Sequence, residues 1–240
     1  MRTWMLASAL LALTAACTTE TTSPSPLAPT VKLTGTVYGF NTPDPIVGAK
    51  VSVAELPDLV TTTDAQGVYV LAVPDGKPVT PFVTADTYHT MHLQTFTTAE
   101  KGLDHVNFQT PDNGIFGVLA QLVGVDPSAP VCHIVSTVST KDIQGLSFAA
   151  FTKFGAHGVA GATASATPTL PPPIYFNKNV VPDAKQVGTS DDGGVLWINV
   201  PAGVYTISAT HPTRKFASFT ATCVAGRLVN ANPPWGLHEL

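Results

Sequence analysis

TDAQGVYVLAVPDG, at residues 63–76, is the stretch of sequence from which the fold of this chain follows. It starts with a turn, because the Asp64 side chain can accept hydrogen bonds from backbone amides two residues on and Gly67 tolerates a positive φ. The residues after the turn alternate in the way that half-buried strands do. The better core face of this strand consists of Tyr69, Leu71 and Val73.

The same pattern occurs a second time, as SDDGGVLWINVPAG at residues 190–203. Gly67 and Gly194 each precede a proline by seven residues, and each proline precedes a glycine by two. In this alignment the second core face consists of Leu196, Ile198 and Val200, which places Trp197 on the opposite face. We expect the Pro-x-Gly turn to reverse the chain, so that residues 204–209 form the hairpin partner of the strand.

Further short strands precede each copy, with the sequences TGTVY at 34–38, IVGAKVSV at 46–53 and VAGATASA at 159–166. A repeated unit of short strands separated by Gly and Pro turns predicts β-sandwiches. The motifs Gly-x-Val, Gly-Ala-x-Val and Thr-Asp-x-x-Gly-x-Tyr-x-Leu-x-Val-Pro-x-Gly resemble the carboxypeptidase regulatory-like domain, which is similar to transthyretin and to the wider carbohydrate-binding-like fold. The resemblance covers residues 31–110 well and 131–232 less closely, because Val195-Leu196-Trp197 replaces the usual Gly-x-Tyr. It implies a fold and an extracytoplasmic location, and no catalytic residues.

The expected fold is therefore all-β, with two tandem Greek-key, transthyretin-like β-sandwich domains and a short linking helix. Asp112 is a suitable N-cap for that helix, the apolar stripe includes Phe116 and Leu119, and Gly124 is a natural stop. The expected organisation is a lipoprotein signal peptide at 1–17, a disordered tether at 18–30, a first sandwich at 31–110, a linker with the helix at 111–130, and a divergent second sandwich with an insertion at 131–240.

The N-terminal residues have the pattern of an export signal. Arg2 supplies a positive charge, residues 4–16 are an apolar run, and Cys17 follows Leu13-Thr14-Ala15-Ala16. The run is shorter than the ~20 residues that span a bilayer, and a charged start before a short apolar core is typical of a secretory signal peptide. The residues before Cys17 resemble the bacterial lipobox, which implies lipidation of Cys17 and anchoring to a membrane of the cell envelope. Two alternatives are a soluble secreted form, released by ordinary signal peptidase, and a buried N-terminal helix.

The cysteine count fits export. The chain has three cysteines, and lipidation of Cys17 would leave Cys132 and Cys223 in an oxidising compartment, where disulfides persist. We expect a disulfide between these two; the alternative is a pair of buried free thiols.

Composition excludes one class of partner. The formal net charge is −4, only 12% of residues are charged, and there is no cluster of Lys and Arg. Nucleic acid binding needs such a cluster, so the expected partners are the membrane, through the N-terminal lipid, and a protein or glycan of the envelope.

No group of residues predicts catalysis, a metal or a cofactor. His89 and His92 would point to opposite faces of a strand, and His105 brings no carboxylate or thiolate at the spacing of a zinc site. Asp191-Asp192 could contribute oxygen ligands to calcium, although Asp is expected in a turn for backbone reasons alone. A Gly-x-Ser-x-Gly elbow is absent from the sequence.

The remaining binding candidates are aromatic. Trp197, Tyr175 and Trp235 would form a possible ligand-binding surface if they shared an exposed groove, since planar rings stack on sugars and anchor protein interfaces. The other interpretation is that Trp197 packs under the insertion. The sequence thus favours a non-enzymatic structural or interaction module of the cell envelope, with a carbohydrate-binding module as the alternative and a metal-dependent enzyme as the least favoured function.

Overall fold

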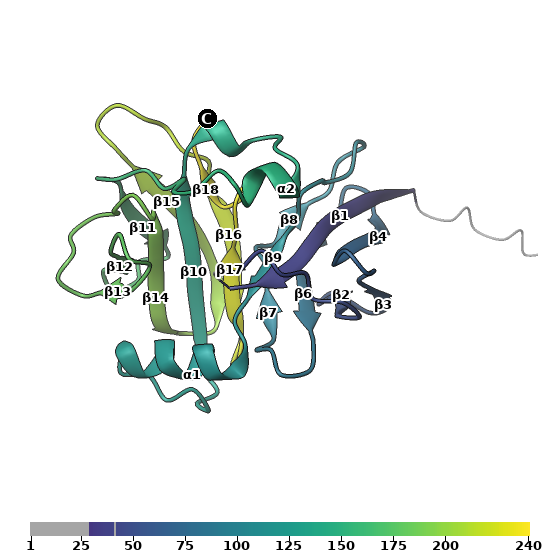
Figure 1. Cartoon of the computed structure of the whole chain (residues 1–240), viewed down its shortest axis with the longest axis horizontal. Helices are drawn as coiled ribbons and strands as arrows, with labels where there is room; N and C mark the ends of the chain where they lie inside the picture. Colours follow the sequence, from purple (N-terminus) through teal and green to yellow (C-terminus); the bar gives the residue numbers. More distant parts are fainter. Residues whose placement is uncertain (1–28, 41) are drawn as a thin grey trace, which may run out of the picture.

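A computed structural model describes residues 29–40 and 42–240; the predicted signal peptide with Cys17, and nearly all of the predicted tether, lie outside these residues. The fold is all-β, as predicted (Figure 1). The strands of the first half are β1 (Thr30–Gly39), β2 (Lys50–Val53), β3 (Leu56–Thr62), β4 (Val68–Pro74), β5 (Pro78–Val79), β6 (Pro81–Thr84), β7 (Met91–His92), β8 (Phe96–Thr97) and β9 (Phe108–Thr110). Those of the second half are β10 (Cys132–Ser139), β11 (Thr163–Thr167), β12 (Ile174–Phe176), β13 (Pro182–Asp183), β14 (Gly194–Val200), β15 (Gly203–Thr210), β16 (Phe219–Cys223), β17 (Leu228–Ala231) and β18 (Leu237–His238).

The first sandwich packs β4, β1 and β9 against β3, β2, β6 and β7. Its defining turn has the expected chemistry, because Asp64 Oδ1 accepts hydrogen bonds from the amides of Gln66 and Val68, both at 2.9 Å, and Gly67 has φ +72°. The core face predicted for β4 is confirmed, since Tyr69, Leu71 and Val73 are buried. Tyr69 also donates from its hydroxyl to the carbonyl of Val106.

The second sandwich repeats this construction down to individual hydrogen bonds. Thr63 Oγ1 accepts from the amide of Ala49, and Thr189 Oγ1 accepts from the amide of Ala162, both at 2.9 Å. Each of these buried hydroxyls also donates to a carbonyl, that of Ile46 in the first copy and that of Val159 in the second. Thr63 and Thr189 are therefore equivalent, with an offset of 126 residues, whereas their partners on the preceding segment are offset by 113 because of the insertion.

That offset corrects the face predicted for the second strand. The sequence alignment paired Gly67 with Gly194, whereas Gly193 is the equivalent glycine, with φ +78°. A slip of one residue moves every side chain of a strand to the other face. Trp197 therefore takes the place of Leu71, and it lies inside the second core together with Val195.

A β-bulge in β14 returns the residues that follow it to the alignment predicted from the two prolines. Cys132 pairs with Val200 and Ile134 pairs with Trp197, so β14 has one residue more than β10 between these pairs. Asn199, which lies in this segment, has φ +53°. The extra residue brings Val200 back into the core and leaves the proline that follows at the spacing seen in the sequence.

The predicted hairpin after the second copy is wrong. β14 pairs with β10 and β12, whereas β15 pairs with β11 and β16. The turn at residues 201–202 thus carries the chain from one sheet of the sandwich to the other. The pairing of β14 explains the difference, because β10 and β12 occupy both of its edges and leave none for β15. Trp197 of β14 and Ile207 of β15 therefore reach the second core from opposite sheets.

The two sandwiches share one long sheet. β17 of the second half pairs in parallel with β7 of the first half, through Leu228–Met91 and Val229–His92. The resulting order is β13-β12-β14-β10-β17-β7-β6-β2-β3. Figure 1 shows these strands side by side across the middle of the molecule.

The predicted linking helix is α1 (Asn113–Leu122), and Asp112 caps it by accepting a hydrogen bond from the amide of Ile115 at 2.8 Å. Its inner side has Ala120, which is buried, and Phe116 and Leu119, which are half-buried. Ile115 and Leu122 of the predicted apolar stripe are exposed. Residues 142–155, where the sequence left helix and loop open, overlap the end of a 3₁₀ turn (Lys141–Ile143) and contain a short helix, α2 (Phe148–Phe151).

Candidate functional site

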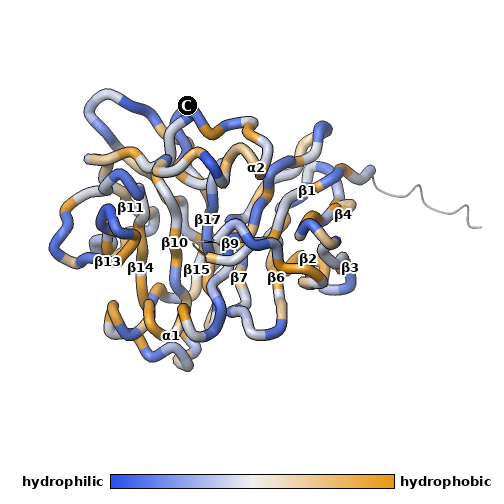
Figure 2. The backbone as a smooth tube through the Cα atoms, viewed as in Figure 1, coloured by the Kyte–Doolittle hydropathy of each residue, from blue (hydrophilic) through white to orange (hydrophobic). Residues whose placement is uncertain are grey.

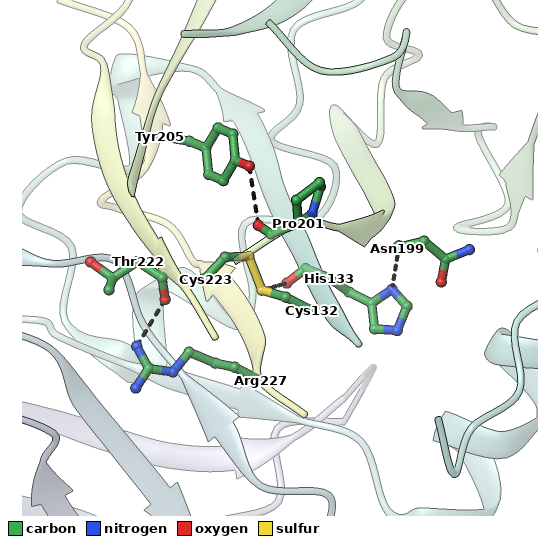
Figure 3. Close-up of a disulfide and its surroundings, with 8 residues drawn as sticks. All are labelled: Cys132, His133, Asn199, Pro201, Tyr205, Thr222, Cys223 and Arg227. Carbon is green, nitrogen blue, oxygen red and sulfur yellow. Dashed lines mark hydrogen bonds between the residues drawn. A yellow bond between two sulfur atoms is a disulfide. The ribbon is translucent and has the colours of Figure 1, made fainter. Parts of the chain in front are cut away.

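The disulfide expected between Cys132 and Cys223 is present (Figure 3). The two Cα atoms are 5.7 Å apart, and both residues are buried. Cys132 belongs to β10 and Cys223 to β16, so the bond joins the two sheets of the second sandwich across its core.

Hydrogen bonds around the disulfide hold the neighbouring turns in place (Figure 3). Tyr205 donates from its hydroxyl to the carbonyl of Pro201 at 3.1 Å, which fixes the turn between β14 and β15. Arg227 donates from Nη1 to the carbonyl of Thr222 at 2.8 Å, which closes the turn between β16 and β17. These polar groups serve the structure of the second sandwich.

Trp197 and Tyr175 lie together, but their rings are buried, with 3% and 5% of their surface exposed. Trp197 donates from Nε1 to the carbonyl of Pro171 at 3.0 Å, and the Tyr175 hydroxyl accepts from the amide of Ala164 at 3.0 Å. The proline-rich insertion therefore covers Trp197. An open hollow with a volume of about 950 Å³ lies beside them, between β11 and the insertion, and Gln186 is part of its lining.

Trp235 lies apart from this pair, on the first sandwich. Its ring makes an edge contact with Phe96 at 5.4 Å between centroids, and its Nε1 donates to the carbonyl of Asp104 at 3.0 Å. The three aromatic residues therefore do not share an exposed groove, and Trp197 packs under the insertion, which was the other interpretation of the sequence. A ligand-binding role for each of them separately stays a prediction.

Three histidines lie near the junction of the two halves. The His89 ring stacks on Phe116 of α1 at 3.6 Å, and the His92 ring stacks on Phe82 at 5.0 Å. His133 accepts a hydrogen bond at Nδ1 from the amide of Asn199 at 3.4 Å. His89 and His92 thus face different neighbours, and the structure does not converge them on one point.

Burial lowers the pKa of all three imidazoles. For His92, burial and then the charge of Arg227 lower the pKa to about 3. For His89, burial acts first and the neighbouring His133 second, and for His133 burial alone lowers the pKa. All three rings are therefore neutral at pH 7.

Acid is expected to weaken the fold through these residues. An unfolded histidine has a pKa near 6.5. Between pH 6.5 and about 3, residue 92 is therefore protonated in the unfolded chain and neutral in the folded protein. The stability contributed by neutral His92 is present above pH 6.5 and is lost as the pH falls through that window, by up to ~1.4 kcal/mol per pH unit. Urea unfolding at pH 7.0 and pH 5.0 should show a smaller loss for His92→Gln than for the unsubstituted protein.

His211→Gln is the matched control, because this ring lies at a surface turn, where its Nδ1 accepts from the amide of Thr213. An equal loss of stability in all three proteins between the two pH values would contradict the role assigned to His92.

Residues 29–40 and 42–240 offer neither a metal site nor a membrane-spanning helix. They contain no group of three or more His, Cys, Asp or Glu side chains placed to hold a metal ion. Within the same residues there is no helix with the length and apolar character needed to span a membrane.

Sequence reasoning missed one concave site. A groove runs along the outer face of the second sandwich, and its lining combines Phe40 and Gln109 of the first half with Val135 and Asn230 of the second. The available signal was the run Val195-Leu196-Trp197-Ile198, which is apolar at every position and so predicts a strand covered on both faces. The walls of the groove depend on the contact between the halves, for which the sequence has no signal.

The chain resembles several solved structures at low sequence identity and low TM-score. The sequence matches no protein-family model and no curated protein. Among solved structures it is similar to the Bacillus anthracis TIE protein (13% identity, 88% of this chain and 34% of that chain, TM-score 0.27) and to a streptococcal ancillary pilin (9%, 87% and 68%, 0.27). A third is GBS52, the minor pilin of Streptococcus agalactiae (9%, 87% and 96%, 0.26). The chain spans about a third of the length of the TIE protein, and likeness at these TM-scores assigns no function.

Proposed function

We propose that this protein is an exported lipoprotein that acts as a non-enzymatic structural or interaction module of the cell envelope. In this proposal Cys17 carries the lipid, the residues between Cys17 and β1 form a tether, and two carboxypeptidase regulatory-like sandwiches form the displayed body.

The observation that carries the proposal is the long sheet shared by the two sandwiches. Separate modules on a flexible linker move relative to one another, whereas hydrogen bonds between β7 and β17 join these two into one body. Side-chain contacts across the same junction add to it, because Thr95 and Thr222 share a hydrogen bond at 2.7 Å and Asn232 donates to the carbonyl of Asn107. A stiff body on a tether is suited to holding a partner away from a surface.

The disulfide supports export. Structural disulfides persist in oxidising compartments outside the cytoplasm, and the bond between Cys132 and Cys223 lies in the core of the second sandwich. Together with the charged start and apolar run before Cys17, it favours a protein that folds after translocation.

Lipidation and location can be tested in one experiment. The full chain is produced in a bacterium with labelled palmitate, and membrane and soluble fractions are separated. We expect label in the unsubstituted protein and its recovery with the membranes, and we expect Cys17→Ser to lose the label and most of the membrane association. The double variant Cys132→Ser/Cys223→Ser is the matched control, which should keep the label because its lipobox is intact.

Two results would overturn the proposal. One is an unlabelled protein in the cytoplasmic fraction with both remaining cysteines open to alkylation. The other is a label that persists in Cys17→Ser.

The carbohydrate-binding alternative has less support. Sugar recognition by stacking needs exposed ring faces, and the rings of Trp197 and Tyr175 are buried with their polar atoms engaged inside the protein.

A further inference from the structure

The outer face of the second sandwich is apolar where a solvated sheet face would be polar. Val195 and Trp197 of β14 point into the core, so Leu196 and Ile198 point outward. Val135 of the adjacent β10 faces the same way and pairs with Leu196. Outer faces of antiparallel sheets are ordinarily polar, so this face is built to be covered.

Helix α1 covers only one end of this face. In Figure 1 the helix lies across one end of β14 and β10, and Figure 2 shows apolar residues along both the helix and β14. Phe116, Leu119 and Ala120 of the helix approach Leu196 and Ile198 of the sheet without filling the space between them. A cavity of about 80 Å³ remains, and its lining is almost entirely apolar.

A second, polar hollow adjoins this cavity. It has a volume of about 320 Å³, and it shares with the apolar cavity the lining residues Phe40, Gln109, Val135, Phe176 and Asn230. Its far end is lined by polar and charged side chains, namely Thr137, His157, Lys178, Asp191 and Asp192. The two hollows therefore form one groove with an apolar end beneath α1 and a polar end beside the two aspartates.

The carboxylates outnumber the single ammonium, that of Lys178, at the polar end. Asp192 is held in place, because its Oδ2 accepts a hydrogen bond from the amide of Gly194 at 3.0 Å. Burial raises the pKa of Asp192, while the bond from Gly194 and the nearby His157 act in the opposite direction. A carboxylate that has lost part of its hydration is stabilised by a cation placed against it.

Gly194 keeps this arrangement possible. A Cβ at this position would lie 2.5 Å from Asp192 Oδ2 and 2.7 Å from Cγ of Phe176. A side chain at this position would displace either the carboxylate of Asp192 or the ring of Phe176. The polar end of the groove therefore requires glycine at position 194.

We propose that this groove binds an amphiphile, with a short apolar chain beneath α1 and a cationic head group beside Asp191 and Asp192. The site is independent of the anchoring and display proposed above. The two ends of its floor, His133 and Thr137, are four residues apart on β10, or ~13 Å at the rise of a strand. The apolar end is smaller than the ~150 Å³ cavity that holds benzene, so it accepts the last few carbons of a chain.

The test uses n-alkylammonium ions as probes. The full chain carrying Cys17→Ser is titrated by calorimetry with butyl-, hexyl- and octylammonium, so that no attached lipid competes. Each added CH₂ is expected to tighten binding about three- to fourfold until the apolar end is filled. Octanoate and octanol, with the same chain and a different head, should bind at least tenfold more weakly than octylammonium.

Variants at the two ends locate the ligand. Ala120→Leu fills the space beneath α1 and should weaken octylammonium binding at least tenfold, while Val118→Ala, on the exposed side of the same helix, should leave it unchanged.

Asp192→Asn keeps an acceptor for the amide of Gly194 and should abolish the preference for octylammonium over octanol. Asp58→Asn, at an exposed position of β3, is its control.

Each contrary result rejects the proposal. Equal or tighter binding of octanoate rejects the cationic head, and unchanged binding in Ala120→Leu rejects the apolar end. Absence of binding by all three ammonium ions at millimolar concentration rejects the site, provided that thermal unfolding shows the protein to be folded.

Discussion

Loss of the Cys132–Cys223 disulfide is expected to lower the free energy of unfolding by about 4–5 kcal/mol. The bond closes a loop with a sequence separation of 91 residues, and restriction of the unfolded chain over a loop of this size corresponds to that value. For a chain of this length the change corresponds to a fall in Tm of roughly 10–15 °C. Thermal unfolding of Cys132→Ala/Cys223→Ala beside the oxidised protein measures it.

The accessibility of the disulfide adds a kinetic expectation. Both cysteines are buried between the two sheets, so a reducing agent alone should act slowly, and reduction should become fast only when urea unfolds the second sandwich. Cys17→Ser, which leaves the disulfide intact, should match the unsubstituted protein in Tm. A double variant whose Tm lies within 2 °C of the oxidised protein would show that the cross-link does not stabilise the fold.

Trp197→Ala is expected to cost about 3–5 kcal/mol of unfolding free energy. The side chain is 3% exposed and lies among the core residues of the second sandwich, and truncation of a buried large aromatic ring leaves a cavity with a cost in this range. Loss of the hydrogen bond from Trp197 Nε1 would also leave the carbonyl of Pro171 without this donor. Urea unfolding followed by circular dichroism provides the measurement.

Ile198→Ala is the matched control for this prediction. Ile198 is the next residue of β14, it points to the groove, and it is partly exposed, so its truncation should cost clearly less than that of Trp197. In the alignment suggested by the sequence, Ile198 would be the core residue and Trp197 the outward one. A larger loss in Ile198→Ala than in Trp197→Ala would therefore restore that alignment and contradict the register in which Trp197 lies in the core.

The register of β14 could not be predicted from the local sequence. Gly67 and Gly194 align when the two prolines are used as the reference, since both copies have the same Gly-to-Pro spacing. The hydrogen bonds of Thr63 and Thr189 show that these two threonines are equivalent. Counting from them aligns Gly67 with Gly193, one residue before Gly194. The bulge at Asn199 accounts for this difference of one residue between the two alignments. A strand with apolar residues on both faces gives no sequence signal for the position of such a bulge.

By itself, the sequence determined the local elements of this protein. The Asp64–Gly67 turn, the buried face of β4, the helix capped by Asp112 and the repetition of the unit all follow from side-chain chemistry within a few residues, and the pairing of Cys132 with Cys223 was expected from the cysteine count. Tertiary structure alone decided the register of β14, the crossing of residues 201–202 between sheets, and the joining of β7 to β17. These features depend on which apolar faces meet across a core and which strand edges pair, and such contacts link residues far apart in the sequence, such as Cys132 with Val200 and Met91 with Leu228. The groove under α1 belongs to the second group, because its lining combines residues from both halves of the chain.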